Sequence, residues 1–237
     1  SLAQVIYGLY GYGLTRMIQK ALKEADGLTF ASKALMKAYK GFNKNNICIN
    51  SVVVLPKQRR DVKRKMQVLY VGRFSQGKGF NFLITVAKSI IDQGKFKKLS
   101  FVFIGGDQPR VEEKYKKGIK FLGKLSHDQT LNNIKQSKLV VVPSQIFDAF
   151  PRSIVESLSH GTPVVATNVG GSKEALGKAG ILVEAGNELE LKKAIIKLAH
   201  DKELWDKYSK NGIEQIKQYS PEIISTKTEK FYKKILQ

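Results

Sequence analysis

The chain has 237 residues, enough to bury one well-formed core. It contains 41 Lys and Arg against 20 Asp and Glu, a net charge of +21 that attracts anions, but these cations are spread over predicted helix faces without a nucleic-acid recognition motif. The single cysteine, Cys48, excludes an internal disulfide framework and a cysteine-based metal cluster, and it favours a cytoplasmic setting.

The N-terminal region predicts a few short elements. Residues 1–14 are apolar but too short to span a bilayer, and we expect them to pack on preceding protein rather than to touch a membrane. The pattern then predicts a helix over 15–24, a strand over 27–31, a helix over 33–39 and a strand over 47–50. These elements are too few to form a complete domain.

The densest charge run is Lys57–Lys65, KQRRDVKRK, which follows Pro56. A proline followed by consecutive charges is typical of an exposed linker. Contact with a membrane or another polyanion is the alternative interpretation of this run.

A regular pattern begins at Met66. Apolar runs alternate with helical stretches, which predicts a parallel sheet with helices on both faces. The predicted strands are 66–71, 99–104, 119–122, 138–142, 163–166 and 180–183. Beyond Gly186 the sequence predicts three helices, over 188–199, 202–217 and 221–236.

Short polar or glycine-containing turns follow these strands. The carboxyl ends of parallel strands meet at one edge of a sheet, where open α/β sheets bind their ligands. All these turns are therefore predicted to lie on the same side of the domain. They are Gly72-Arg73, Gly105-Gly106, Gly123-Lys124, Ser144–Arg152 and Gly170-Gly171.

The stretch Ser144–Gly171 contains the clearest candidate site. It places Asp148 in the turn before a helix that is predicted to start at Pro151, and Glu156 inside that helix. The free N–H groups of a helix N-terminus and two nearby carboxylates suit a sugar, because carboxylates accept hydrogen bonds from hydroxyls and amides donate them. Gly170-Gly171 permits a tight turn and a close approach of backbone to a ligand.

Two blocks of the sequence resemble one known family. The first is Val68–Phe80, VLYVGRFSQGKGF, with Arg73 and Lys78 five positions apart. The second joins Asp148 and Glu156, separated by seven residues, to the strand GTPVVA and a Gly-Gly turn. In both blocks the chain is similar to the retaining GT-B glycosyltransferases, which include bacterial glycan mannosyl- and glucosyltransferases. The family usually has Glu at the first acidic position, so Asp148 shortens the reach of that carboxylate.

The resemblance implies roles for individual residues. Arg73 and Lys78 would bind the donor diphosphate in place of a divalent metal, so no metal or other cofactor is expected. Asp148 would contact the donor sugar and completes the predicted catalytic set, while Glu156 would bind the ribose hydroxyls. The remaining predicted donor contacts are Gly72, Gly106, Leu125, Ala149, Phe150, Pro151, Arg152 and Gly170.

The resemblance also implies a domain organisation. A GT-B enzyme has two Rossmann-like domains, so the chain is predicted to hold the C-terminal donor-binding domain and an incomplete piece of the N-terminal one. The first residue is Ser, which fits a fragment of a longer protein, an engineered chain or a processed chain, and of these we favour a fragment. The predicted parts are a terminal piece of the N-terminal domain (1–55), a basic linker (56–65), the donor-binding domain (66–218) and a C-terminal crossing helix (219–237) with Phe231 and Tyr232 as its aromatic pair.

The implied function is transfer of a sugar, with retention, from a UDP- or GDP-linked donor to a glycan or lipid-linked acceptor. Acceptor groups would belong to the missing N-terminal domain or to a partner chain, so the chain alone is expected to bind donor without transferring it. The basic surface suits peripheral contact with an anionic membrane at the cytoplasmic face, and no specific nucleic acid is predicted. A non-catalytic nucleotide-binding subunit paired with an acceptor-binding chain, and a GT-B epimerase, are the alternatives.

Overall fold

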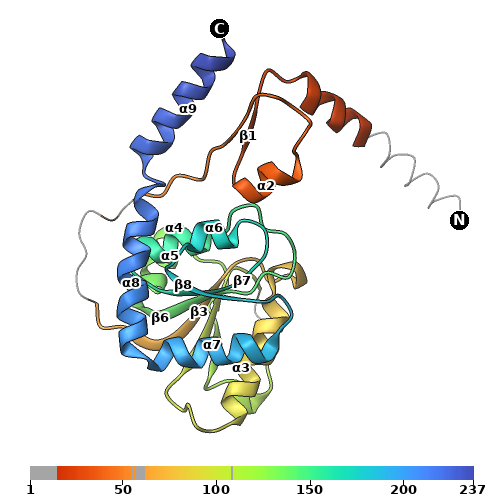
Figure 1. Ribbon diagram of the computed structural model, residues 1–237. Coiled ribbons are helices and arrows are strands. Elements are labelled where there is room, and N and C mark those ends of the chain that lie inside the picture. The colour runs from red at the N-terminus through yellow and green to blue at the C-terminus, as the bar shows by residue number, and fades with distance from the viewer. Residues whose placement is uncertain (1–14, 55, 57–61, 108) are drawn as a thin grey trace, which may run out of the picture.

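The computed structural model describes residues 15–54, 56, 62–107 and 109–237 (Figure 1). The predicted apolar segment 1–14 and much of the predicted linker, residues 57–61, lie outside the described residues. Within the described ranges, no helix has the length and apolar character needed to cross a bilayer.

A six-stranded sheet forms the centre of the larger part of the molecule. Every pairing in it is parallel, and the strand order is β5-β4-β3-β6-β7-β8. The predicted strands are confirmed, each end to within one residue. The strands are β3 (Lys65–Val71), β4 (Ser100–Ile104), β5 (Ile119–Phe121), β6 (Ser137–Val142), β7 (Val164–Thr167) and β8 (Gly180–Val183).

Helices cover both faces of the sheet, as predicted. The strands bury alternate residues on opposite faces: Val68 and Tyr70 face one core cluster with α3 and α7, while Leu69 faces the other with α4, α5 and α6. The α8 helix joins the two layers, because Trp205 packs on the first cluster and Ile216 on the second. The helices are α3 (Phe80–Asp92), α4 (His127–Gln136), α5 (Arg152–Ser159), α6 (Ser172–Leu176), α7 (Glu188–His200) and α8 (Lys202–Lys217), with short 3₁₀ helices η1 (Gln76–Lys78) and η2 (Glu113–Tyr115).

The direction of chain winding reverses between β3 and β6. From β3 the chain proceeds outward through β4 and β5, then returns to the other side of β3 as β6 and continues through β7 and β8. Loops that leave β3 and β6 therefore diverge to opposite sides of the sheet, and such a point opens a crevice beyond the carboxyl ends of the two strands.

A smaller part, which we call the N-terminal unit, comprises the helix over residues 15–24, β1 (Leu28–Phe30), α2 (Lys33–Ala38) and β2 (Asn46–Cys48). Strands β1 and β2 form a separate parallel two-stranded sheet, and Ser32 caps α2 by accepting a hydrogen bond from Leu35 N. The two helices and two strands predicted here are present, although β2 ends two residues before the predicted position 50. A two-stranded sheet buries too little apolar surface to be stable alone, so this unit depends on its contacts with the rest of the chain.

The last helix, α9 (Pro221–Ile235), returns to the N-terminal unit (Figure 1). A Cβ added at Gly27 would lie 2.7 Å from the ring of Phe231, so the helix packs closely where β1 begins. Phe231 is buried, whereas Tyr232 is 52% exposed. Of the aromatic pair singled out in the sequence, Phe231 alone is buried and faces Gly27.

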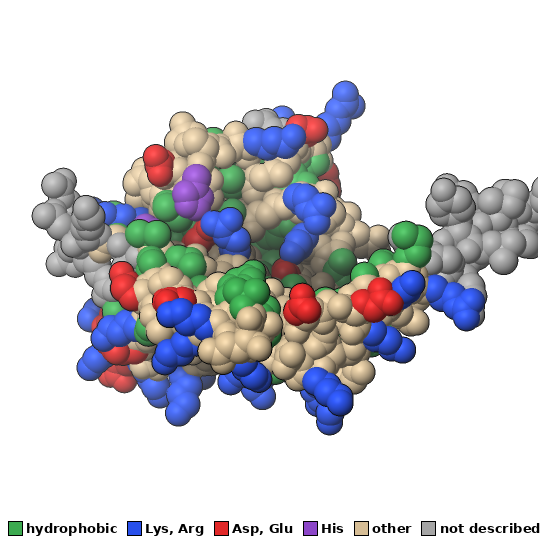
Figure 2. Space-filling view, turned by 90° about the horizontal axis from the view of Figure 1, so that it is seen from above, with side chains coloured by type: hydrophobic (Ala, Val, Ile, Leu, Met, Phe, Trp, Pro, Cys, Tyr) green, Lys and Arg blue, Asp and Glu red, His purple; other side chains and the backbone are tan. Residues whose placement is uncertain are grey.

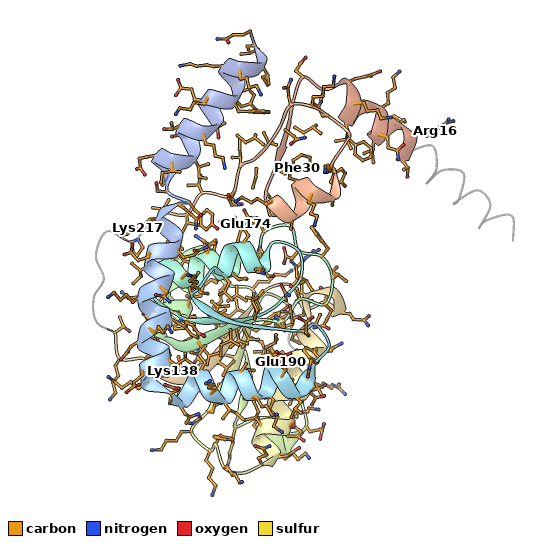
Figure 3. The ribbon with its side chains drawn as sticks, in the orientation of Figure 1. Arg16, Phe30, Lys138, Glu174, Glu190 and Lys217 are labelled. Atoms are coloured by element: carbon orange, nitrogen blue, oxygen red, sulfur yellow. The ribbon has the colours of Figure 1, made fainter. Side chains whose placement is uncertain are left out.

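Glu174 on α6 connects the N-terminal unit to the large sheet (Figure 3). Its carboxylate accepts hydrogen bonds from Asn50 Nδ2 at 2.8 Å, from the backbone N–H of Lys33 at 2.7 Å and from Cys48 Sγ at 3.6 Å. Burial, together with the negative charge of Glu174, raises the pKa of the Cys48 thiol to about 11. The thiol is therefore protonated at neutral pH.

We expect Glu174→Ala to lower the free energy of unfolding by roughly 2–3 kcal/mol, because its donors lose their acceptor. Cys48 should then react faster with a thiol reagent at pH 8, and mass spectrometry of the labelled protein measures this rate. In the wild type, the stability that depends on protonated Cys48 is present below pH 9.0 and is lost as the pH rises toward 11. Glu184→Ala, at an exposed glutamate, is the control, and equal labelling rates in all three proteins would contradict the predicted role of Glu174.

Arg64 fixes the chain where it enters the large sheet. Its guanidinium group donates to the carbonyl oxygens of four residues and to Thr162 Oγ1, and it lies 4.9 Å from the centre of the Trp205 ring. Burial lowers the pKa of Arg64. The carbonyl acceptors belong to Lys135, Ser137, His160 and Gly161, at distances of 2.8 to 3.2 Å.

Candidate functional site

A cavity of about 250 Å³ opens where the chain winding reverses, between the ends of β3 and β6. Residues from three segments line it: the end of β3 with Lys78 of η1, the end of β6, and the start of α5. The lining residues are Tyr70, Val71, Gly72, Lys78, Val142, Pro143, Ser144, Asp148, Phe150, Pro151, Arg152 and Ser153. Gly72, Lys78, Asp148, Phe150, Pro151 and Arg152 were predicted from the sequence, and the fold brings them together.

Gly79 places Lys78 at this cavity. The backbone of Gly79 has a φ of 71°, and a Cβ at this position would overlap the carbonyl oxygen of Pro143. Only glycine allows both the left-handed conformation and this approach. A hydrogen bond of 2.8 Å from Gln145 N to Gly77 O holds the same two segments together. The η1 turn is thus fixed against the loop that follows β6.

Lys78 and Asp148 form an ion pair inside the cavity. Their Nζ and Oδ2 atoms are 2.6 Å apart, and the two side chains are 32% and 13% exposed, respectively. Ser144 Oγ lies 3.4 Å from the same carboxylate oxygen. The structure thus joins two residues that are 70 positions apart in the sequence.

The glycines after β7 leave room for the backbone of the loop that carries Asp148. Gly170 has a φ of 53°, and a Cβ there would overlap the carbonyl oxygen of Asp148, while a Cβ at Gly171 would overlap that of Ala149. Gly171 N also donates to Asp148 O at 2.7 Å. The group that closely approaches these glycines in the structure is protein backbone. A contact of Gly170 with a donor stays a prediction.

The first turn of α5 faces the cavity. Pro151 is its N-cap residue, with a φ of −69°, so the helix begins one residue later than the sequence predicted. Arg152 and Ser153 line the cavity, and the N–H groups of a first helical turn have no acceptor within the helix. Together with the partial positive charge of a helix N-terminus, these N–H groups suit an anionic ligand.

Glu156 lies beside the cavity rather than in it. Its Oε1 accepts from Arg152 Nη2 at 3.1 Å, and its side chain is 16% exposed. Both residues line a neighbouring cavity of about 140 Å³ between α4, α5 and residues 52–54. Arg152 borders both cavities, so it lies between the cavity that Lys78 lines and the one that Glu156 lines. Burial lowers the pKa of His160, which also lines the second cavity.

Besides Glu156 and Gly170, four predicted site residues lie outside the lining of the first cavity. The Arg73 side chain is exposed, although its carbonyl oxygen accepts from Tyr70 Oη at 2.6 Å directly after the end of β3. Gly106 allows Phe74 to approach, because a Cβ there would lie 2.5 Å from the Phe74 ring. Leu125 packs against the second core cluster. Ala149 lies between two lining residues without lining the cavity itself.

Tyr70 and Ser144 line the cavity, although neither side chain was predicted to have a role in the site. Tyr70 is buried, its pKa is raised by burial, and its hydroxyl group holds the Gly72-Arg73 turn. Ser144 lies two residues after the end of β6, a position at the crevice edge of a parallel sheet. Its position was therefore readable from the sequence, whereas the contact of Tyr70 with the turn was not.

The family comparison agrees with this geometry. Residues 55–215, more than half of the chain, match the family "Glycosyl transferases group 1". The chain belongs to this family. Its parallel α/β fold and the resemblance to the GT-B glycosyltransferases are both confirmed. The boundaries drawn at residues 55, 65 and 218 stay predictions.

The similar proteins described next are longer than this chain. It is 31% identical to an uncharacterised glycosyltransferase of Methanocaldococcus jannaschii, over 70% of this chain and 48% of that protein. It is 22% identical to the phosphatidyl-myo-inositol mannosyltransferase of Mycobacterium leprae, over 81% of this chain and 52% of that protein. A variant of TarM from S. aureus, in complex with fondaparinux, alpha-GlcNAc-glycerol and UDP, matches with a TM-score of 0.79 at 21% identity, over 92% of this chain and 46% of that one. This glycosyltransferase chain thus spans about half the length of these relatives.

Proposed function

We propose that this chain is the donor-binding half of a retaining glycosyltransferase that takes a UDP- or GDP-linked sugar. The observation that carries the proposal is the cavity between the ends of β3 and β6. Both Lys78 and the first turn of α5 line this cavity. Family membership supports transferase chemistry, and the crevice lies where open parallel sheets bind nucleotides.

The chemistry of the donor explains why this arrangement suits transfer. When the bond between sugar and diphosphate breaks, the leaving diphosphate gains negative charge. Fixed cations and N–H groups that contact it stabilise the transition state more than the ground state. Lys78 and the N–H groups of Arg152 and Ser153 supply these donors, and Arg73 at the end of β3 adds a second cation once its exposed side chain turns toward the bound diphosphate.

The nucleoside is assigned to the side of the cavity where Glu156 lies. A carboxylate accepts from both hydroxyls of a ribose, and Glu156 is held toward Arg152 at 3.1 Å, next to the diphosphate position. Gly106 follows β4 and Leu125 follows β5, two paired strands whose carboxyl ends lie on the ligand edge of the sheet. These two residues are the proposed base contacts. UDP in the complex of the similar TarM variant supports a uridine donor.

The acceptor is assigned to protein beyond this chain. Relatives of about twice the aligned length support a second half, and the N-terminal unit, with its two-stranded sheet, is the part that would belong to it. A glycan or lipid-linked acceptor is proposed, because the M. leprae relative is named for a phosphatidyl-inositol acceptor. Lys and Arg side chains border the hollow in Figure 2 together with several acidic ones, and the net charge of +21 suits peripheral contact with anionic lipid.

Isothermal titration calorimetry with UDP and GDP, in buffer containing EDTA, tests the proposal. We expect the wild type to bind one of the two nucleotides without metal. Lys78→Ala should weaken binding about tenfold to a hundredfold, because a charge-assisted hydrogen bond to phosphate is lost. Lys207→Ala, at an exposed lysine of α8, lowers the net charge equally and should bind like the wild type. Absence of binding by the wild type, with and without added Mg²⁺, would refute the proposal.

A further inference from the structure

The charge at the cavity is balanced before any donor arrives. Among the residues that line it, Asp148 is the one acidic side chain, and it pairs with Lys78 at 2.6 Å. The ammonium group proposed to hold the diphosphate is therefore already neutralised by a carboxylate. Arg152, the other lining cation, is paired with Glu156 at 3.1 Å. A diphosphate that enters this cavity must compete with carboxylates for both cations.

Asp148 cannot move away easily when a diphosphate enters. Its carbonyl oxygen accepts from Gly171 N at 2.7 Å, and the backbone of Gly170 packs directly against it. Its side chain is 13% exposed and lies beside Ser144 Oγ. Lys78, in contrast, extends on a flexible four-carbon stem from the short η1 turn and is 32% exposed. On binding, the cation can change partner while the carboxylate stays in place.

We propose that Asp148 is a positioning residue that acts through Lys78 and weakens the hold of the site on the diphosphate. This inference rests on the proposed function. In the free protein the carboxylate fixes the ammonium group over the cavity. In the complex with product, the carboxylate remains next to the negative diphosphate and competes with it for Lys78, which favours release of the nucleoside diphosphate after transfer.

Competition for Lys78 and a direct contact between Asp148 and the donor sugar predict different changes in ligand affinity when Asp148 is replaced. A carboxylate that only accepts from a sugar hydroxyl would lower affinity for the nucleotide sugar when replaced, and would leave affinity for the bare nucleoside diphosphate unchanged. A carboxylate that competes for Lys78 would raise affinity for the bare diphosphate when replaced.

Calorimetry with UDP, GDP and inorganic pyrophosphate distinguishes the two. We expect Asp148→Asn, which keeps the shape of the side chain, to bind the preferred nucleotide and pyrophosphate about tenfold more tightly than the wild type. The affinity of the variant should also fall more steeply with added salt, because one uncompensated positive charge has been gained. Asp148→Ala serves as the second variant if Asp148→Asn fails to fold, and it should show the same direction of change.

A double-mutant cycle tests the route through Lys78. In a Lys78→Met background, Asp148→Asn should change nucleotide affinity less than twofold, because the competed cation is absent. An equal gain in both backgrounds would overturn the role of Lys78. Wild type that binds nucleotide, with Asp148→Asn binding equally or more weakly, would overturn the inference while leaving the proposed function intact. If neither protein binds any nucleotide, both proposals fail.

Discussion

Replacing Gly79 with alanine should lower the free energy of unfolding by about 3–5 kcal/mol and weaken nucleotide binding at least tenfold. Two effects add at this position. Its φ of 71° costs any residue with a Cβ about 1–2 kcal/mol, and that Cβ would overlap the Pro143 carbonyl group, which cannot rotate away as a side chain would. The η1 turn would have to shift, and Lys78 would shift with it.

Gly94→Ala is the matched control for this variant. Gly94 also has a positive φ, 66°, but a Cβ there would meet no atom within 4 Å. It should therefore show the conformational cost alone, about 1–2 kcal/mol, with unchanged nucleotide affinity. Urea denaturation followed by circular dichroism measures the stability of both variants, and calorimetry measures binding. Equal losses of stability in the two variants would show that the approach of Pro143 to Gly79 costs nothing.

Arg64→Ala should lower the free energy of unfolding by about 3–5 kcal/mol. Arg64 donates to Thr162 Oγ1 and to four carbonyl oxygens near the start of β6 and after the end of α5. Its removal leaves these acceptors without their donor. It also removes one of two cations that lie 4.9 Å from the centre of the Trp205 ring, while Lys138 remains there. Trp205 is the single tryptophan of the chain, so its fluorescence follows unfolding directly at this point.

One further variant separates the shape of the Arg64 side chain from its charge, and a second variant at Lys63 is its control. Arg64→Lys keeps the positive charge but lacks the planar fork of donors, and should recover less than half of the lost stability. Lys63→Ala removes an exposed charge from the neighbouring position and should change stability by no more than about 0.5 kcal/mol. If Arg64→Lys were as stable as the wild type, charge rather than the set of directed hydrogen bonds would explain the effect.

The parallel sheet was predictable from the sequence because each strand is a short apolar run bounded by turn residues. Runs such as 138–142 are too short for a helix, and their alternation with helical stretches leaves a parallel arrangement as the simplest solution. The start of α5 was predicted one residue early, since proline is compatible with both the cap and the first helical position. Such one-residue differences at helix ends are ordinary.

The site was predictable only in part. That the loops after β3 and β6 border one crevice at the carboxyl edge follows from parallel topology, but the partner that each side chain selects does not. The Lys78–Asp148 ion pair depends on the orientation of two side chains 70 residues apart, and the exclusion of Glu156 from the first cavity depends on its pairing with Arg152. The glycines show the same limit, because the sequence indicated a close approach at Gly170 without revealing that the approaching group is the Asp148 backbone.

The two chain segments that connect the N-terminal unit and α9 to the large sheet lie side by side. Val53 N donates to Tyr219 O at 2.9 Å, so the outgoing and the returning crossing meet at one place. Within the part of the chain that the structure describes, the two connections are therefore tied to each other at this point. Among the described residues, the Glu174 carboxylate adds hydrogen bonds from Lys33 N and Asn50 Nδ2, and Ala31 packs on the second core cluster, so directed bonds and apolar contact together hold the N-terminal unit against the large sheet.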